Sequence, residues 1–305
     1  MSRVTKRNPA ARPGASRMRV GIIGAGRVGS AIAWHCQRLG YRISGVTDRR
    51  PRQAWVVYGL LKLPYRRLRS RDVAAESDVL FLTVPDTHLW PEFEAVSRWL
   101  LPGTIVAHCS GTFGVDVFKG AHEQGLETLA LHPIQSFSSH AQAIASLKGC
   151  YFALEGTPRG LRFGRRLVRQ LRGGHIVVRS GNRPLYHAMC VFGSNFVNAL
   201  LDAVETIARQ LHLPRTRAVR MLRPLTQTVL DKAVELGAVA TLTGPVQRGD
   251  AETVRRQLAA LKRNAPELVP VYRVLSLRLV DMSRGQGADR TVLQKVRAAI
   301  ESAGR

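Results

Sequence analysis

The feature that most constrains this chain is an apolar segment running directly into closely spaced glycines: MRVGIIGAGRVGSAIA, residues 18–33. The apolar run predicts a buried strand, and helical apolar spacing follows it. Gly24, Gly26 and Gly29 form a G-x-G-x-x-G pattern in the strand–turn–helix context that the pattern requires. Gly24 permits a tight turn, Gly26 lets the backbone approach a pyrophosphate, and Gly29 allows close helix–strand packing. The segment therefore predicts a dinucleotide site, against the alternative of a plain glycine-rich turn.

The identity of the dinucleotide stays open at this level. Asp48 ends the next strand, about twenty residues on, where a carboxylate bonds a ribose 2′-OH and favours NAD. Arg49 and Arg50, directly after it, could instead hold the 2′-phosphate of NADP. The predicted cofactor-binding residues are Gly24, Ala25, Gly26, Arg27, Val28, Gly29, Asp48, Arg49, Val84, Pro85 and Ser110.

The order of elements predicts two domains behind a basic extension at residues 1–17. Strand-like runs alternate with helical ones up to residue 180, which is typical of a doubly wound parallel sheet, a Rossmann fold. From residue 181 the pattern is helical only. We therefore expect an α/β Rossmann domain at 18–180 and an all-α domain at 181–305.

Composition narrows the classes of partner. The 305 residues carry 46 Lys+Arg against 21 Asp+Glu, a formal net charge of +25. The basic residues are spread along the chain without aromatic interleaving, so we expect no specific nucleic-acid partner. The four cysteines show no metal spacing, which favours reduced thiols in a cytoplasmic protein. No apolar run reaches the roughly 20 residues of a membrane-spanning helix.

Polar side chains in two places suggest a substrate site. In the apolar helix LYHAMCVFGSNFVNALL, the side chains of His187, Ser194 and Asn195 fall within one arc. They either satisfy a buried network or line a cleft. The loop TLTGPVQRGD, residues 241–250, brings Arg248 and Asp250 between two helices, where Asp250 could equally be a helix cap. The predicted catalytic residues are His187, Ser110, Ser194, Asn195, Arg248 and Asp250.

Six segments together resemble one family: GIIGAGRVGSAIA, FLTVPD, HCSGT, LHPIQSF, LYHAMCVFGSNFVNALL and LTGPVQRGD. They are similar to the DUF2520 group, bacterial Rossmann-like proteins with a helical C-terminal domain. That group resembles the 6-phosphogluconate-dehydrogenase-like superfamily, which includes ketopantoate reductase and pyrroline-5-carboxylate reductase. The resemblance implies NAD(P)-dependent reduction of a small anion between the domains, and a homodimer formed through the helical domains.

One departure from the family bears on mechanism. Arg183 stands where relatives often have a lysine, and arginine can bind an anion but is a poor general acid. The hypothesis from sequence is a reductase of a 2-oxo or imino acid, with His187 as proton donor and Arg248, held by Asp250, as carboxylate ligand. Its rivals are a non-catalytic NAD(P)-binding regulator and a basic scaffold for nucleic acid.

Overall fold

The computed structural model describes residues 18–302, so the predicted extension at 1–17 lies outside the described residues. The chain forms two compact units that divide between Ser194 and Asn195, called here the first and second units. The domain boundary expected at residue 181 falls at the start of a helix that belongs to the first unit. The compact units do not test where the two predicted domains divide, so the boundary at residues 180–181 stays a prediction.

The first unit contains a seven-stranded sheet in the order β2-β1-β3-β4-β5-β6-β7. Its strands are β1 Arg19–Ile23, β2 Arg42–Thr47, β3 Val79–Leu82, β4 Ile105–His108, β5 Glu127–Pro133, β6 Tyr151–Gly156 and β7 Gly174–Val177. All seven strands were expected from sequence. The expectation of an all-parallel sheet is wrong at one place, because β6 runs antiparallel to β5. β6 begins beside the end of β5, with Phe152 paired to Pro133, so the chain returns to the same end of the sheet.

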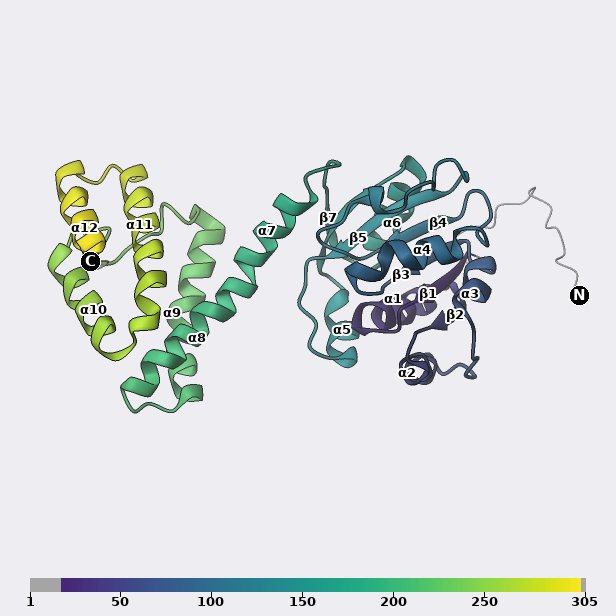
Figure 1. Cartoon of the computed structure of the whole chain (residues 1–305), viewed down its shortest axis with the longest axis horizontal. Helices are drawn as coiled ribbons and strands as arrows, with labels where there is room; N and C mark the ends of the chain where they lie inside the picture. Colours follow the sequence, from purple (N-terminus) through teal and green to yellow (C-terminus); the bar gives the residue numbers. More distant parts are fainter. Residues whose placement is uncertain (1–17, 303–305) are drawn as a thin grey trace, which may run out of the picture. The chain divides into compact units, whose positions relative to one another are not determined.

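Helices cover both faces of this sheet (Figure 1). Those of the first unit are α1 Arg27–Arg38, α2 Pro51–Leu61, α3 Ser70–Ala75, α4 Leu89–Ser97, α5 His140–Leu147, α6 Pro158–Gln170 and α7 Arg183–Gly193, with short 3-10 helices η2 Asp86–His88 and η3 Val115–Val117. One core cluster packs α1, α2, α5 and α6 on the sheet, and another packs α3 and α4 on the opposite face. Alternation along β3 explains this division: Val79 and Phe81 enter the first cluster, Leu80 and Leu82 the second.

The strand order places a topological switch point between β1 and β3. The connection after β1 leads to β2 on one side, and the connection after β3 leads to β4 on the other, so the loops at the carboxyl ends of β1 and β3 diverge there. In open α/β sheets, ligands bind in the crevice at this point. The loops that follow β1 and β3 are therefore the first place to look for a site.

The second unit is all helical, as expected from sequence. Its helices are α8 Asn195–Gln210, α9 Arg215–Leu236, α10 Ala251–Asn264, α11 Val269–Gly285 and α12 Arg290–Ser302, with the 3-10 turn η4 Pro266–Leu268. α8 packs on α9, and α10, α11 and α12 share a core that includes Val254, Val280 and Val296. None of the helices in the described part of the chain is both long and apolar enough to cross a membrane.

The expectation of one continuous helix over the segment LYHAMCVFGSNFVNALL is wrong in one respect. The helix breaks at Ser194, whose backbone (φ −137°, ψ −69°) leaves the helical region, so that α7 and α8 are separate helices. The break divides the expected stripe of polar side chains, with His187 and Ser194 in the first unit and Asn195 in the second.

Candidate functional site: a glycine-loop pocket and an imidazole cluster

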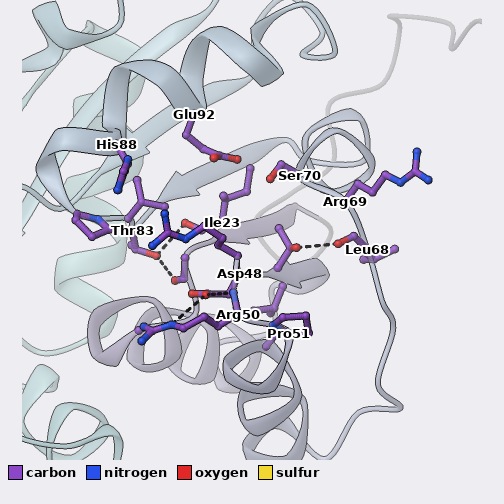
Figure 2. Close-up of a pocket in the computed structure, with 18 of the residues that line it drawn as sticks. Ile23, Asp48, Arg50, Pro51, Leu68, Arg69, Ser70, Thr83, His88 and Glu92 are labelled. Atoms are coloured by element: carbon purple, nitrogen blue, oxygen red, sulfur yellow. Dashed lines mark hydrogen bonds and ion pairs between the residues drawn. The ribbon is translucent and has the colours of Figure 1, made fainter.

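A pocket of about 1050 Å³ lies at the switch point of the sheet. Its lining comes from the glycine loop after β1, the end of β2, the α2–α3 segment, and the residues that follow β3. Across the pocket from Asp48 and Arg50 lie His88 and Glu92 (Figure 2). Eight of the predicted cofactor residues line it: Gly24, Gly26, Arg27, Val28, Asp48, Arg49, Val84 and Pro85.

The three glycines of the loop have the geometry that their predicted roles require. Gly24 has φ +101°, and a Cβ there would come within 2.8 Å of the Val84 nitrogen, so the turn and the contact with the end of β3 both need glycine. A Cβ on Gly29 would collide with the Gly24 carbonyl. Around Gly26, in contrast, nothing lies within 4 Å of the position a Cβ would take. A ligand can therefore approach the backbone at Gly26.

The amino end of α1 makes this approach favourable to an anion. Gly26 is its N-cap, and among residues 18–302 no side chain caps the helix. The first N–H groups of an α-helix have no partner within the helix, and the helix dipole places partial positive charge there. Helix starts of this kind bind phosphate groups. The geometry thus fits the diphosphate of a dinucleotide.

The sequence predicted that the Asp48 carboxylate binds a ribose, but in the structure it bonds backbone nitrogens. Its Oδ2 accepts a hydrogen bond from the Ala25 nitrogen at 2.8 Å, and its Oδ1 accepts one from the Arg50 nitrogen at 2.8 Å. The carboxylate thereby ties the end of β2 to the glycine loop. Arginines dominate the surrounding wall of the pocket: Arg49, Arg50, Arg66, Arg67 and Arg69. The sequence interpretation missed the last three, which lie in an irregular segment without a motif.

A second polar group of side chains lies at the carboxyl ends of β4 and β5. His187 Nδ1 lies 3.1 Å from Thr112 Oγ1, and the His187 ring centre lies 6.0 Å from that of His132. His132 Nδ1 lies 2.6 Å from the Tyr186 hydroxyl. A Cβ on Gly111 would approach Nε2 of His187 to 2.9 Å and Nε2 of His132 to 3.0 Å, so both imidazoles converge on this glycine.

Burial decides the protonation of this cluster. Desolvation, helped by the nearby charges of His187 and Arg183, lowers the pKa of His132 to about 4, so that its ring is neutral at pH 7. Burial raises the pKa of the Tyr186 phenol, which stays protonated. Because imidazole nitrogen is a better acceptor than the nearby Cys190 sulfur, we assign the phenol proton to a bond with His132 Nδ1.

Ser110 and His108 are buried side chains at the end of β4 and in the loop that follows it. Ser110 Oγ donates to Asp86 Oδ2 at 2.9 Å and accepts from the Thr112 and Phe113 nitrogens at 3.2 and 3.1 Å. The hydroxyl thus organises its own loop and connects it to the end of β3. His108 is fully buried.

Arg183 is buried in the first unit, which the sequence did not predict. Arginine in place of the lysine of relatives suggested an anion ligand. The Arg183 side chain is instead 1% exposed and forms an ion pair with Glu155 at 3.0 Å. It has no route to a substrate. A glutamate within the apolar run YFALEG was the available signal, because a charge in a buried strand requires a partner.

The loop that contains Arg248 and Asp250 belongs to the second unit. Asp250 caps α10: its Oδ1 accepts from the Thr253 nitrogen at 2.9 Å and its Oδ2 from the Thr253 hydroxyl at 2.6 Å. These bonds, with a smaller effect of Arg248, lower the pKa of Asp250. Gly249 has φ +75°, and a Cβ there would collide with Val292 of α12. Capping and packing therefore explain this loop, and its role in substrate binding stays a prediction.

The first unit is thus a Rossmann-type dinucleotide-binding unit by its topology, glycine loop and pocket. Residues 5–133 match the model of the Rossmann-like domain, and residues 150–279 match the domain of unknown function DUF2520. The chain is a Rossmann-like protein with a DUF2520 domain, as the resemblance implied. No curated protein matches the sequence.

Solved structures share this fold at low sequence identity. Protein BF3122 from Bacteroides fragilis is 20% identical with a TM-score of 0.72, over 87% of this chain and 99% of its own. The 1-pyrroline-5-carboxylate reductase from Streptococcus pyogenes is 19% identical (TM-score 0.56, 94% and 98%). A reductive aminase from Aspergillus terreus in complex with NADPH is 16% identical (0.60, 95% and 94%). At these identities the likeness is one of fold.

Proposed function

We propose that this chain is an NAD(P)H-dependent reductase that acts on a small 2-oxo or imino acid, with ketopantoate as the first candidate. The observation that carries the proposal is the open backbone at Gly26, at an uncapped helix start, inside a pocket large enough for a dinucleotide. Two of the similar folds belong to a pyrroline-5-carboxylate reductase and to a reductive aminase in complex with NADPH, which supports the same reaction class.

The chain's own residues would divide the work as follows. The bound nicotinamide cofactor supplies a hydride, near Val84, Pro85 and the Ser110 loop. His187, held at Nδ1 by Thr112, gives a proton to the developing alkoxide or amine, because a positioned imidazole is the most frequent general acid in enzymes. The neutral His132 beside it adds no second positive charge to the cluster. The product is a hydroxy or amino acid.

Arg248, Ser194 and Asn195 enter the proposal as substrate ligands. Arg248 would bind the substrate carboxylate, because a guanidinium matches its two oxygens. Ser194 and Asn195 would orient the reacting group. Asp250 acts through the loop that it caps.

The arginines around the pocket favour NADPH over NADH in this proposal. A 2′-phosphate is a dianion near neutral pH, and Arg49, Arg50, Arg66 and Arg67 line the pocket around Asp48. Both oxygens of Asp48 already accept backbone N–H groups, which weakens its case as a ribose ligand. Calorimetric titration with NAD, NADH, NADP and NADPH would test the preference, and equal affinity for NADH and NADPH would contradict it.

A homodimer is part of the proposal. Large apolar side chains one turn apart on α9 are exposed in the single chain, including Met221, Leu225 and Val229. Contiguous apolar surface of this kind marks association sites. Light scattering on the purified chain would give its mass, which we expect to be twice 33.6 kDa.

The decisive experiment compares His187→Ala and Arg248→Leu with the unaltered chain. Single-turnover reduction of ketopantoate would be followed at saturating NADPH. We expect His187→Ala to slow the step at least about 100-fold, a typical effect of losing a general acid, and Arg248→Leu to slow it through loss of the carboxylate ligand. Unchanged rates in both would remove the assignment. Cofactor binding without turnover of any 2-oxo acid or cyclic imine would favour the non-catalytic regulator, which the loss of a lysine at position 183 also favours.

A further inference from the structure

The bulkiest side chain in the fully buried interior is a charged one, Arg183, at the start of α7. A buried guanidinium is tolerated only when it is paired and hydrogen-bonded. Its Nε donates to Glu155 Oε2 at 3.0 Å. Its Nη1 donates to the Ser110 carbonyl at 3.4 Å, and its Nη2 to the Ala130 and Ala153 carbonyls at 3.2 and 3.4 Å. One side chain therefore joins β5, β6 and the loop after β4.

The same loop, residues 110–115, is held at both ends by buried groups. Glu155 Oε1 accepts from the Val115 nitrogen at 3.4 Å. His108 Nδ1 accepts from the Ser110 nitrogen at 3.2 Å, and its Nε2 donates to the Gly114 carbonyl at 3.0 Å. Desolvation lowers the pKa of His108 to about 4, so the ring is neutral and carries its proton on Nε2.

The middle of this loop contacts the proposed proton donor. Thr112 Oγ1 lies 3.1 Å from His187 Nδ1. His187 follows Arg183 by one turn of α7, so both side chains emerge from the same side of the helix. The guanidinium of Arg183 holds the loop, and its backbone begins the helix that carries His187.

We propose that Arg183 is a positioning residue, whose ion pair with Glu155 locks the 110–115 loop to the first turn of α7 and thereby sets the contact between Thr112 and His187. The proposal rests on the proposed role of His187. A lysine at this position would keep the charge but not the contacts, because one ammonium cannot span four acceptors on three segments. The position therefore orients the proton donor instead of supplying the proton.

The test separates the effect of Arg183 on the position of the His187 side chain from its effect on the stability of the first unit. Arg183→Met leaves Glu155 buried and unpaired, and we expect the melting temperature to fall by roughly 10 °C or more. Arg183→Met combined with Glu155→Leu removes both charges, and we expect most of that loss to be recovered. Arg183→Lys keeps the charge, and Arg179→Met, at an exposed position, serves as the matched control. The four tryptophans, all before residue 100, report unfolding of the first unit.

The deciding readout is the ¹⁵N resonance of His187 Nδ1 in the full-length chain, assigned by its loss in His187→Gln. We expect this resonance to shift in Arg183→Lys and in the double variant, although the latter regains its melting temperature, and to stay unchanged in Arg179→Met. NADPH affinity should stay within about twofold throughout, because Arg183 does not line the pocket. An unshifted resonance in the double variant would overturn the proposal.

Turnover measurements distinguish a failure of the positioning role of Arg183 from a failure of the proposed function. If the unaltered chain reduces ketopantoate, the double variant should do so at least about tenfold more slowly, with kcat rather than KM affected. A double variant as fast as the unaltered chain would overturn the positioning role. If the unaltered chain does not turn over, the proposed function fails, while the His187 resonance still decides whether Arg183 positions that side chain.

Discussion

The two units bury their apolar side chains in different ways. The first unit covers both faces of its sheet, and most apolar residues of its strands are fully buried. In the second unit, α8 and α9 bury only Thr206, Ala208 and Ala218, while much of their apolar surface is exposed. The first unit therefore has a core of its own, whereas α8 and α9 leave exposed an apolar surface of the kind that marks association sites. The following predictions test that contrast, in order of decreasing expected effect.

The buried interior of the first unit should lose stability in mild acid. His108 has a folded pKa of about 4 against about 6.5 unfolded, so between these values the unfolded chain binds the extra proton. The free energy of unfolding should then fall as pH falls from 6.5 to 4, by up to about 1.4 kcal/mol per pH unit. Urea unfolding followed by tryptophan fluorescence at several pH values measures this slope.

A variant isolates the contribution of that histidine. His108→Gln should make the slope shallower, while His122→Gln, at an exposed position, should leave it unchanged. His35 and His132 also have lowered pKa values, so part of the slope should remain. A slope unaltered by His108→Gln would place the acid sensitivity of the first unit elsewhere.

Gly26→Asp should separate folding from cofactor binding within the first unit. The new side chain has open space, and an aspartate in place of glycine at an N-cap stabilises a helix by roughly a few tenths of a kcal/mol. Its carboxylate would also occupy the anion site, so NADPH affinity should fall about 100-fold. Melting temperature and calorimetric titration measure the two effects, with Gly26→Ala as the control for size alone. Retained affinity in Gly26→Asp would exclude the amino end of α1 as the diphosphate site.

Removing two pocket arginines should have a smaller and selective effect. Arg66→Gln combined with Arg67→Gln should weaken NADPH binding about tenfold, roughly 1.4 kcal/mol, and leave NADH binding unchanged. Lys262→Gln combined with Arg263→Gln on α10 of the second unit is the matched loss of two positive charges. Equal weakening of both cofactors would mean that these arginines act on the diphosphate or on overall charge.

The smallest effect on the first unit should come from the exposed face of α9. Leu225→Lys with Val229→Lys should convert the expected dimer to a monomer, because both side chains are exposed in the single chain. The tryptophan-monitored stability of the first unit should change by less than about 0.5 kcal/mol. Light scattering gives the mass. A variant that stays dimeric would show that another surface covers these helices, and a monomeric unaltered chain would remove the contrast between the units.

The local sequence was sufficient to predict features that depend on the backbone of a single short segment. The glycine roles at Gly24, Gly26 and Gly29 could be predicted because each follows from one strand–turn–helix segment. The break at Ser194 and the direction of β6 could not, because an apolar run does not specify where a helix ends or which end of the sheet a strand begins at.

The remaining parts of the candidate site depended on residues distant in the chain. Nothing near Arg183 in sequence indicates Glu155, and nothing near Asp48 shows that its carboxylate meets the Ala25 nitrogen. Likewise, Thr112 and His187 are far apart in the chain, and the loop after β4 is bonded by Arg183 of α7 and by Glu155 of β6, which no local pattern indicates.

The sequence alone determined the Rossmann class, the glycine loop, the helical second half and the residues able to meet an anion, because these follow from local periodicity and backbone sterics. Only the tertiary structure decided which charges are buried, which carboxylate belongs to the loop, and which imidazoles burial keeps neutral. Those properties depend on desolvation and on hydrogen-bond partners, which arise when distant segments pack together.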